Sequence, residues 1–249
     1  MQCIVLCAGF ATRLYPLTRH RPKQLLSIGS GCVLDQIMDR ISDAGIKQAT
    51  LVCNQRFIHE FEQWRRQQPS PVSVHLIDNG VTAEDQRRGS VGDLNLALET
   101  IDLRDDFWVL HGDNFFTFSL CPVMNAFHQQ GNTLVLYDVV SEARARRAGQ
   151  VTCNASDRII DFVEKPLQPK STWVSIGIYA FRAEIRSQIQ QYMATGRSTD
   201  RSGDLMAWLH TRVPLYAFRV PRAHGVWIDI GTPTAYQRAK TAIQNKVRS

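Results

Sequence analysis

The stretch CAGFATRLYPLTRHRPKQLLSIG, residues 7–29, follows the first apolar run of the chain, QCIVLC, and decides how the rest is interpreted. Its small residues, among them Gly9 and Ala11, leave backbone N–H groups free to turn toward an anion. Arg13 offers a planar fork that matches phosphate oxygens, and Lys23 offers a point charge. The stretch has neither G-K-[ST] nor G-x-G-x-x-G, so it is neither a Walker loop nor a dinucleotide fingerprint. It predicts a loop that wraps a polyphosphate, with a solvated basic surface loop as the alternative.

The composition describes an ordinary globular chain of 249 residues, with 44% hydrophobic and 21% charged side chains. No apolar stretch approaches the ~20 residues that a membrane span needs, and the first residues lack the basic segment of a signal peptide. The six cysteines form no C-x-x-C pair, which argues against a zinc site or a disulfide framework. We therefore expect a cytoplasmic protein with no membrane partner.

The formal net charge is +6, a value that raises the question of nucleic-acid binding. The basic residues are spread along the chain, however, and aromatic residues do not interleave with them as they do in a stacking platform. We expect no nucleic-acid partner. Anionic small molecules would use part of the positive charge, and solvated surface explains the rest.

Strand and helix patterns alternate through the first half of the chain. Apolar runs predict strands at 2–7, 49–53, 72–77, 107–111 and 132–140, and helical spacing predicts helices at 33–45, 55–68, 94–101, where Asp93 would be the cap, and 120–130. This alternation predicts an α/β fold with a Rossmann-like, mostly parallel sheet flanked by helices. Ligands bind such sheets at the carboxyl ends of the strands. The loop at 8–24 and the turn at 112–114 should therefore face one another.

The second half has a different rhythm. Residues 149–165 resemble a hairpin with its turn at 154–157, and a strand at 173–181 precedes a helix that ends near 195. Further strands are expected at 214–220 and 225–231, before a last helix that starts at Thr232-Pro233. We expect one compact domain over 1–249, with a small β-rich lobe for a second substrate.

Five stretches, in order, resemble the motifs of the sugar-phosphate nucleotidylyltransferases, which include glucose-1-phosphate thymidylyltransferases and mannose-1-phosphate guanylyltransferases. They are LCAGFATRLYPLTRHRPKQLLSIG (6–29), HGDNFF (111–116), AGQVT (148–152), DFVEKPLQPKSTWVSIGIYAF (161–181) and WIDIGTP (227–233). The resemblance implies the nucleotide-diphospho-sugar transferase fold, with 1–140 mainly binding nucleotide and 141–249 mainly binding sugar phosphate. It implies an enzyme that joins a nucleoside triphosphate to a sugar 1-phosphate and releases pyrophosphate.

The resemblance also implies roles for individual residues. Arg13, Lys23 and Asp113 would be catalytic, and Asp113 and Asp229 would bind Mg²⁺, an ion that suits two carboxylates with phosphate oxygens and water. Nucleotide contacts would come from Leu6, Ala8, Gly9, Phe10, Ala11, Thr12, Arg13, Lys23, Asn79, Gly89, Ser90 and Asp113. Sugar-phosphate contacts would come from Asn114, Gly149, Glu164, Lys165, Gly177 and Tyr179.

Several of these residues, each taken alone, also have an ordinary structural explanation. Asp113 has the chemistry of a turn residue, Asp229 that of a helix-entry residue, and Glu164-Lys165 that of a surface ion pair. A glycine is usual in this family where the chain has Ala11, and alanine is tolerable there if its φ stays negative.

Base and acceptor are open at this stage. Residues 78–99 differ from the base-reading segment of the family, although Glu84, Asp85 or Gln86 would be placed to read a base edge. Two alternatives to the main hypothesis are a cytidylyltransferase acting on a non-sugar phosphate or phosphonate and a non-catalytic regulatory subunit. A homo-oligomer is left open.

Overall fold

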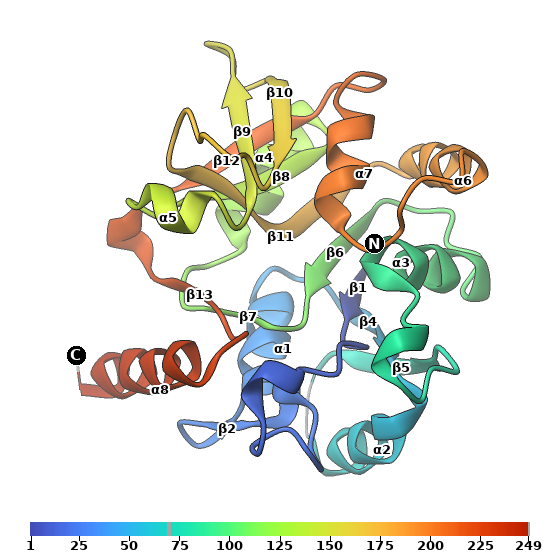
Figure 1. Cartoon of the computed structure of the whole chain (residues 1–249), viewed down its shortest axis with the longest axis vertical. Coiled ribbons are helices and arrows are strands. Elements are labelled where there is room, and N and C mark those ends of the chain that lie inside the picture. The colour runs from blue at the N-terminus through green and yellow to red at the C-terminus, as the bar shows by residue number, and fades with distance from the viewer. Residues whose placement is uncertain (69–70, 249) are drawn as a thin grey trace.

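The computed structural model describes residues 1–68 and 71–248, and within them the central element is a nine-stranded sheet. Its main path runs β10-β9-β11-β6-β1-β4-β5, with β8 beside β11 and β12 beside β8 (Figure 1). The strands are β1 (Gln2–Leu6), β4 (Gln48–Cys53), β5 (Ser73–Asp78), β6 (Phe107–His111), β8 (Thr133–Asp138), β9 (Gly149–Cys153), β10 (Ile159–Glu164), β11 (Trp173–Phe181) and β12 (Tyr216–Val220).

Two small two-stranded sheets lie outside the main sheet: β2 (Ser27–Ile28) with β3 (Gly31–Cys32), and β7 (Asn114–Phe116) with β13 (Trp227–Asp229). The helices are α1 (Val33–Asp43), α2 (Ile58–Gln67), α3 (Gly89–Thr100), α4 (Cys121–Gln130), α5 (Glu142–Ala145), α6 (Ile185–Ala194), α7 (Ser202–Leu209) and α8 (Pro233–Arg248). Short 3-10 turns occupy Thr12–Leu14, Lys23–Leu25, Gln55–Phe57, Glu84–Gln86 and Arg222–His224.

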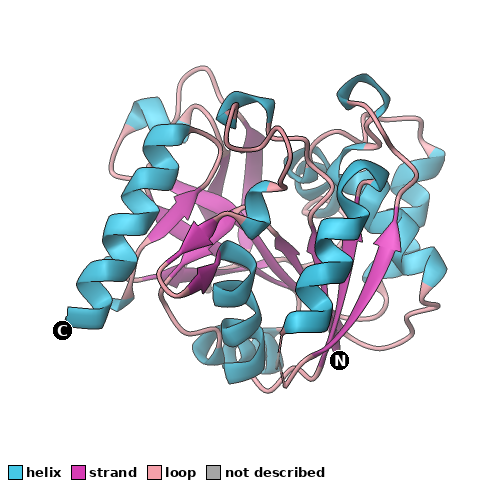
Figure 2. Ribbon diagram, turned by 90° about the horizontal axis from the view of Figure 1, so that it is seen from below, coloured by secondary structure: helices cyan, strands magenta, loops and turns pink. Residues whose placement is uncertain are grey.

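Helices cover both faces of the sheet, as Figure 2 shows. Strand β1 explains why: Cys3 and Val5 face one apolar cluster, and Ile4 and Leu6 face the other, because successive side chains of a strand point to opposite faces. Apolar residues of α1, α2, α4 and α8 complete the first cluster, and those of α3, α6 and α7 complete the second. A strand buried on both faces needs the continuous apolar run that opens this sequence.

The parallel part of the sheet determines where the loops lie. Strands β1, β4, β5 and β6 pair in parallel, so their carboxyl ends share one edge. The chain leaves β1 and β6 side by side, and the amide of Gly112 donates to the carbonyl of Leu6 at 2.9 Å. The expected meeting of the first loop with the turn at 112–114 is thereby confirmed.

In the main sheet, the antiparallel pairs enter with the second half of the chain. Strand β11 runs antiparallel to β6, β8 and β9, and β9 with β10 forms the predicted hairpin. The α/β fold with a large, mostly parallel central sheet is confirmed.

Two differences from the sequence-based expectation bear on the site. Asp93 does not cap a helix: α3 begins at Gly89, and Asp93 lies buried inside it, where it accepts a hydrogen bond from Asn79 at 2.8 Å. Helix α7 was not predicted, although it contributes to the site described next. No helix among the described residues is long and apolar enough to cross a membrane.

Candidate active site

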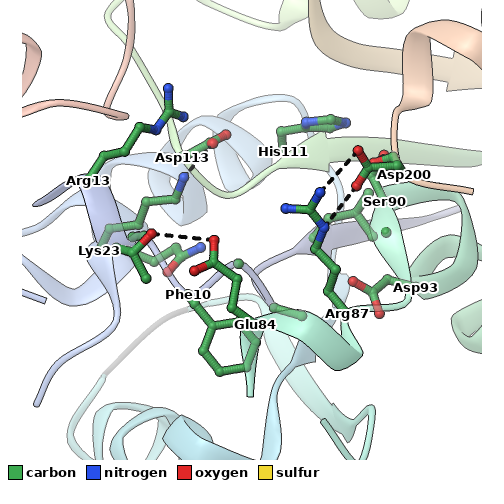
Figure 3. A pocket seen from close by; sticks show the side chains of 17 residues that line it. Phe10, Arg13, Lys23, Glu84, Arg87, Ser90, Asp93, His111, Asp113 and Asp200 are labelled. Carbon is green, nitrogen blue, oxygen red and sulfur yellow. Dashed lines mark hydrogen bonds and ion pairs between the residues drawn. The ribbon is translucent and has the colours of Figure 1, made fainter. Parts of the chain in front are cut away.

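Two cavities meet at the carboxyl edge of the parallel strands. The loop cavity, about 250 Å³, is lined by residues 8–13, by Lys23 and by the start of α3. The hairpin cavity, about 430 Å³, is lined by the β9–β10 hairpin, by β11 and by the start of α7. Residues that line both cavities are Arg13, Arg87, Ser90, His111, Asp113 and Asp200. The two spaces therefore adjoin at a strongly charged junction, which Figure 3 shows from the loop cavity.

Buried side chains hold the backbone of the first loop in place. The amide of Asn54 donates to the carbonyl of Ala8 at 2.9 Å, and the amide of Gln24 donates to the carbonyl of Cys7 at 3.2 Å. The hydroxyl of Thr18 donates to the carbonyl of Ala11 at 2.8 Å. These bonds fix the loop without using its outward N–H groups, which stay available to an anion.

Ala11 adopts a left-handed conformation, with φ of 54° and ψ of 39°. The condition that would have made alanine comfortable there, a negative φ, is not met. The physical reason is the turn itself, because the carbonyl of Ala11 accepts from both Thr18 and the amide of Leu14. A Cβ in this region costs roughly 1–2 kcal/mol, so the loop keeps its shape against local strain.

Lys23 and Asp113 form the closest charged contact of the junction. Their Nζ and Oδ2 atoms lie 2.6 Å apart, and only 11% of the Lys23 side chain is exposed. Burial by itself would raise the pKa of Asp113, but the charge of Lys23, with smaller help from His111, outweighs it and lowers that pKa. Asp113 is therefore a carboxylate held in place by a buried ammonium group (Figure 3).

Asp229 reaches the junction from far along the chain. Strand β13 pairs with β7 so that Asp229 lies opposite Asn114, and the amide of Ile230 donates to the carbonyl of Asp113 at 2.9 Å. Part of Asp229 stays open to solvent, yet burial of its carboxyl and the charge of Asp113 raise its pKa above the ordinary value. A cation placed between the two carboxylates would relieve the repulsion that Asp113 exerts on an ionised Asp229.

The donor set suits the ion that the sequence predicts. Mg²⁺ is commonly held by one or two carboxylates together with substrate phosphates and water, and Asp113 and Asp229 offer such a pair. Among the described residues no group of three or more histidine, cysteine, aspartate or glutamate side chains has metal-binding geometry. Two protein carboxylates fit an ion whose other ligands come from the substrate and water.

The segment after β5 covers the loop cavity. The hydroxyl of Thr12 donates to Glu84 at 3.3 Å, and Arg87 pairs with Asp200 at 3.1 Å (Figure 3). Gly89 lies so close to the backbone of residues 199–200 that a Cβ would overlap it, and its φ is +77°. The glycine is therefore needed for contact with the segment before α7.

Glu164 lies on the wall of the hairpin cavity, against the first turn of α7. A Cβ built at Gly203 would overlap Oε2 of Glu164, so the carboxylate rests directly on that glycine. Burial raises the pKa of Glu164, and Asp204 adds to the rise while Lys165 opposes it. Asn114 donates to the carbonyl of Ile176 at 2.5 Å and accepts from the indole of Trp227 at 2.9 Å.

The structure brings nearly all predicted site residues to these two cavities. The loop cavity is lined by Leu6, Ala8, Gly9, Phe10, Ala11, Thr12, Arg13, Lys23, Gly89, Ser90 and Asp113. The hairpin cavity is lined by Asn114, Gly149, Glu164, Lys165, Gly177, Tyr179 and Asp229. Asn79 lines neither: it is buried behind the loop cavity, where it binds Asp93 and accepts from the guanidinium of Arg88. It supports the wall without reaching the space.

Several residues that line the two cavities were not predicted as site residues. His111 Nε2 lies 2.7 Å from the hydroxyl of Ser202, which donates to Ser90 at 2.9 Å, so one polar chain joins the two cavities. Arg147 and Arg201 line the hairpin cavity. The signal for Arg147 was present, because it lies two residues before Gly149 of the AGQVT motif; nothing local marks Ser202 or Arg201.

Comparison with known proteins identifies relatives over the whole chain. The family model described as nucleotidyl transferase matches residues 2–246. A Sulfolobus acidocaldarius protein named "Putative mannose-1-phosphate guanyltransferase" is 28% identical over 96% of this chain and 62% of its own length. The "Mannose-1-phosphate guanylyltransferase catalytic subunit beta" of Dictyostelium discoideum is 24% identical over 100% of this chain and 66% of its own length. The chain thus spans less than two thirds of these relatives.

A solved structure agrees with the fold. A Bacillus anthracis chain titled "Putative Glucose-1-Phosphate Thymidylyltransferase" superposes with a TM-score of 0.84, at 24% identity over 97% of this chain and 94% of its own. At that identity the likeness establishes the fold alone.

Proposed function

The chain belongs to the nucleotidyl transferase family, and from that premise we propose that it transfers a nucleotidyl group from a nucleoside triphosphate to a sugar 1-phosphate. The observation that carries the proposal is the junction, where a loop built for phosphates and a second, carboxylate-bearing cavity meet at Arg13 and Asp113. A binding protein for one ligand would not need two adjoining cavities with the charged groups at their contact. We also propose that residues 1–140 mainly bind the nucleotide and that residues 141–249 mainly bind the sugar phosphate.

In the proposed reaction a phosphate oxygen of the acceptor attacks the α-phosphorus in line. A new P–O bond forms, the bond between the α-phosphorus and the bridging oxygen breaks, and pyrophosphate leaves with the electron pair. Little covalent chemistry is left to the protein, so positioning and charge neutralisation supply most of the rate.

The residues divide this work by position. The backbone of residues 8–12 and the guanidinium of Arg13 would hold the triphosphate and the leaving pyrophosphate. Lys23, fixed by its 2.6 Å contact with Asp113, would stabilise charge that grows on the α-phosphate. Asp113 and Asp229 would hold Mg²⁺, which when bound supplies positive charge to the phosphate oxygens.

The hairpin cavity would hold the acceptor. Lys165 would pair with the acceptor phosphate, and the Glu164 carboxylate would accept hydrogen bonds from sugar hydroxyls. Gly149, Gly177, Tyr179 and Asn114 would shape the remaining wall. Mannose 1-phosphate with GTP is the first pair to test, because two of the relatives carry that activity in their names.

The test is pyrophosphate release with magnesium, for ATP, CTP, GTP, UTP and dTTP against a panel of hexose and aminohexose 1-phosphates. Release with one base and one sugar phosphate is the expected result. Release only with CTP and choline phosphate or a phosphonate would instead identify a cytidylyltransferase of a non-sugar acceptor. Nucleotide binding without release from any pair would favour a regulatory subunit. The cytoplasmic location and the lack of a nucleic-acid partner stay predictions.

A further inference from the structure

A third cavity adjoins the charged junction, and six of its fourteen lining residues are cations. The arginine pocket, as we call it, measures about 620 Å³, and its basic residues are Arg13, Arg144, Arg146, Arg147, Lys165 and Arg238. Among its described lining residues Asp229 is the one acidic side chain. The cations come from the loop around α5, from α8, from the end of β10 and from the first loop. In Figure 1 α5 and α8 lie on the same side of the molecule, with the β13 segment between them.

The arginine pocket connects to the phosphate side of the site. It shares Arg13, Arg147, Ala148, Lys165, Trp227 and Asp229 with the hairpin cavity. It contains neither Glu164 nor Tyr179, where sugar hydroxyls are expected, and none of residues 8–12 or Ser90 of the loop cavity. An occupant would therefore contact the junction where phosphates react, and neither a base nor a sugar ring.

The positive charge of this pocket is hardly compensated. Within the described part of the chain only one of the six cations has an ion pair with a carboxylate, Arg146 with Glu142, and that pair is long at 3.8 Å. Arg144 and Arg238 both line this pocket, and partial burial together with the charges of Arg238 and Arg222 lowers the pKa of Arg144. Some arginines elsewhere are paired closely, such as Arg182 with Asp106 at 2.9 Å. Unpaired like charges around a concavity attract a polyvalent anion.

We propose that the arginine pocket is a second binding site for pyrophosphate, which receives the product after it leaves the first loop. The proposal rests on the proposed function for the source of the anion. Arg13 lines the loop cavity and the arginine pocket alike, so one guanidinium can keep contact with the pyrophosphate as it moves. Arg144 and Arg238 then offer forks to the phosphate oxygens. The same site would load pyrophosphate for the reverse reaction.

The binding test uses pyrophosphate itself, titrated calorimetrically into the whole chain without magnesium. We expect two pyrophosphates per wild-type chain, one on the first loop and one in the arginine pocket. The double variant Arg144→Gln/Arg238→Gln should lose the second site or weaken it at least tenfold, a change of about the size that losing charge-assisted hydrogen bonds produces. The matched control Arg65→Gln/Arg66→Gln removes the same charge from exposed positions on α2 and should bind like wild type.

Two results would overturn the proposal. One is a single pyrophosphate site in the wild-type chain, and the other is equal binding by the arginine-pocket variant and the α2 control. Thermal melting checks whether the variant is folded. Of the two single variants at this position, Arg238→Lys keeps the charge and should bind the second pyrophosphate more tightly than Arg238→Gln.

A kinetic arm separates the reaction's own product from another phosphate source. In the forward assay the double variant should show weaker product inhibition by added pyrophosphate than the α2 control. A second assay contains a pyrophosphatase, which removes all pyrophosphate, and added orthophosphate. If orthophosphate changes the rate of the wild-type enzyme but not that of the double variant, the arginine pocket binds orthophosphate and the proposal is overturned. Binding of two pyrophosphates without any turnover would contradict the proposed function and support the second pyrophosphate site. Normal turnover with binding of one pyrophosphate would support the proposed function and contradict the second site.

Discussion

The charged junction and the arginine pocket lie side by side, but they differ in whether their charged side chains form ion pairs. In the junction, Lys23 and Asp113 neutralise each other at 2.6 Å, and their side chains are largely shielded from water. In the pocket, Arg144 and Arg238 line one cavity without an ion pair to a carboxylate of the described residues, and Arg144 is half-buried while Arg238 is exposed. A paired and shielded charge keeps its position before substrate arrives. An unpaired and exposed charge binds and releases an anion readily, because solvent and salt screen it.

The largest effect on turnover is expected from removing the carboxylate that neutralises Lys23. Asp113→Asn keeps the shape of the side chain but leaves Lys23 without its partner, so turnover should fall by about 10²–10³-fold. Nucleotide binding should persist. Steady-state kinetics and equilibrium nucleotide binding check both parts.

Asp200→Asn is the matched control for that variant. Asp200 lines the same cavity, but its pair with Arg87 is exposed and worth ~0–1 kcal/mol, so its loss should change turnover only a few-fold. Equal losses in the two variants would mean that Asp113 has no special role.

A second variant separates the acceptor side from the nucleotide side. Gly203→Ala places a methyl group where Glu164 now lies, so the carboxylate must move. Loss of a hydrogen bond to a charged group costs about 1.5–3 kcal/mol, so the KM for the sugar phosphate should rise roughly 10- to 100-fold. The KM for the nucleotide should stay unchanged, and a parallel rise in both would show that the two cavities are not independent.

The pH dependence of acceptor binding should be smaller. Burial raises the pKa of Glu164, so this group becomes protonated at a higher pH than an exposed glutamate does. The acceptor KM should therefore rise as pH falls toward that pKa, because a protonated carboxyl accepts fewer hydrogen bonds. The Glu164→Gln enzyme should have a higher acceptor KM, and this KM should no longer change over the pH range in which Glu164 becomes protonated. An identical pH profile in both proteins would contradict the role of Glu164.

The smallest effect concerns the first loop. Ala11→Gly removes the strain of a Cβ at φ 54°, while glycine adds flexibility to the unfolded chain. The two effects nearly offset, and the free energy of unfolding should rise by about 1 kcal/mol or less. Ala8→Gly is the control, since Ala8 is absent from the positive-φ residues and should lose stability instead. Chemical denaturation measures both, and a stabilised Ala8 variant would refute the explanation.

Sequence-based prediction was most accurate where a function depends on neighbours along the chain. The predicted site residues of the first loop, 8–13 and Lys23, come from one stretch, and all of them line the loop cavity. The strands were found because a strand buried on both faces needs a continuous apolar run, and β11 was predicted with its observed bounds. Asp93 shows the limit: its helix was expected, but the buried contact with Asn79 gives it a role that differs from a cap.

By itself, then, the sequence determined the α/β fold, the small and basic residues of the first loop and the residues that compose each motif. Only the tertiary structure decided the pairings: Lys23 with Asp113, Glu164 against Gly203, and Ser202 between His111 and Ser90. It alone placed Arg144 and Arg238, which lie far apart along the chain, in the lining of one cavity. The physical reason is that local periodicity reports which face of a strand or helix is apolar. Electrostatic and hydrogen-bond energies instead depend on distances in space between residues that local sequence does not relate.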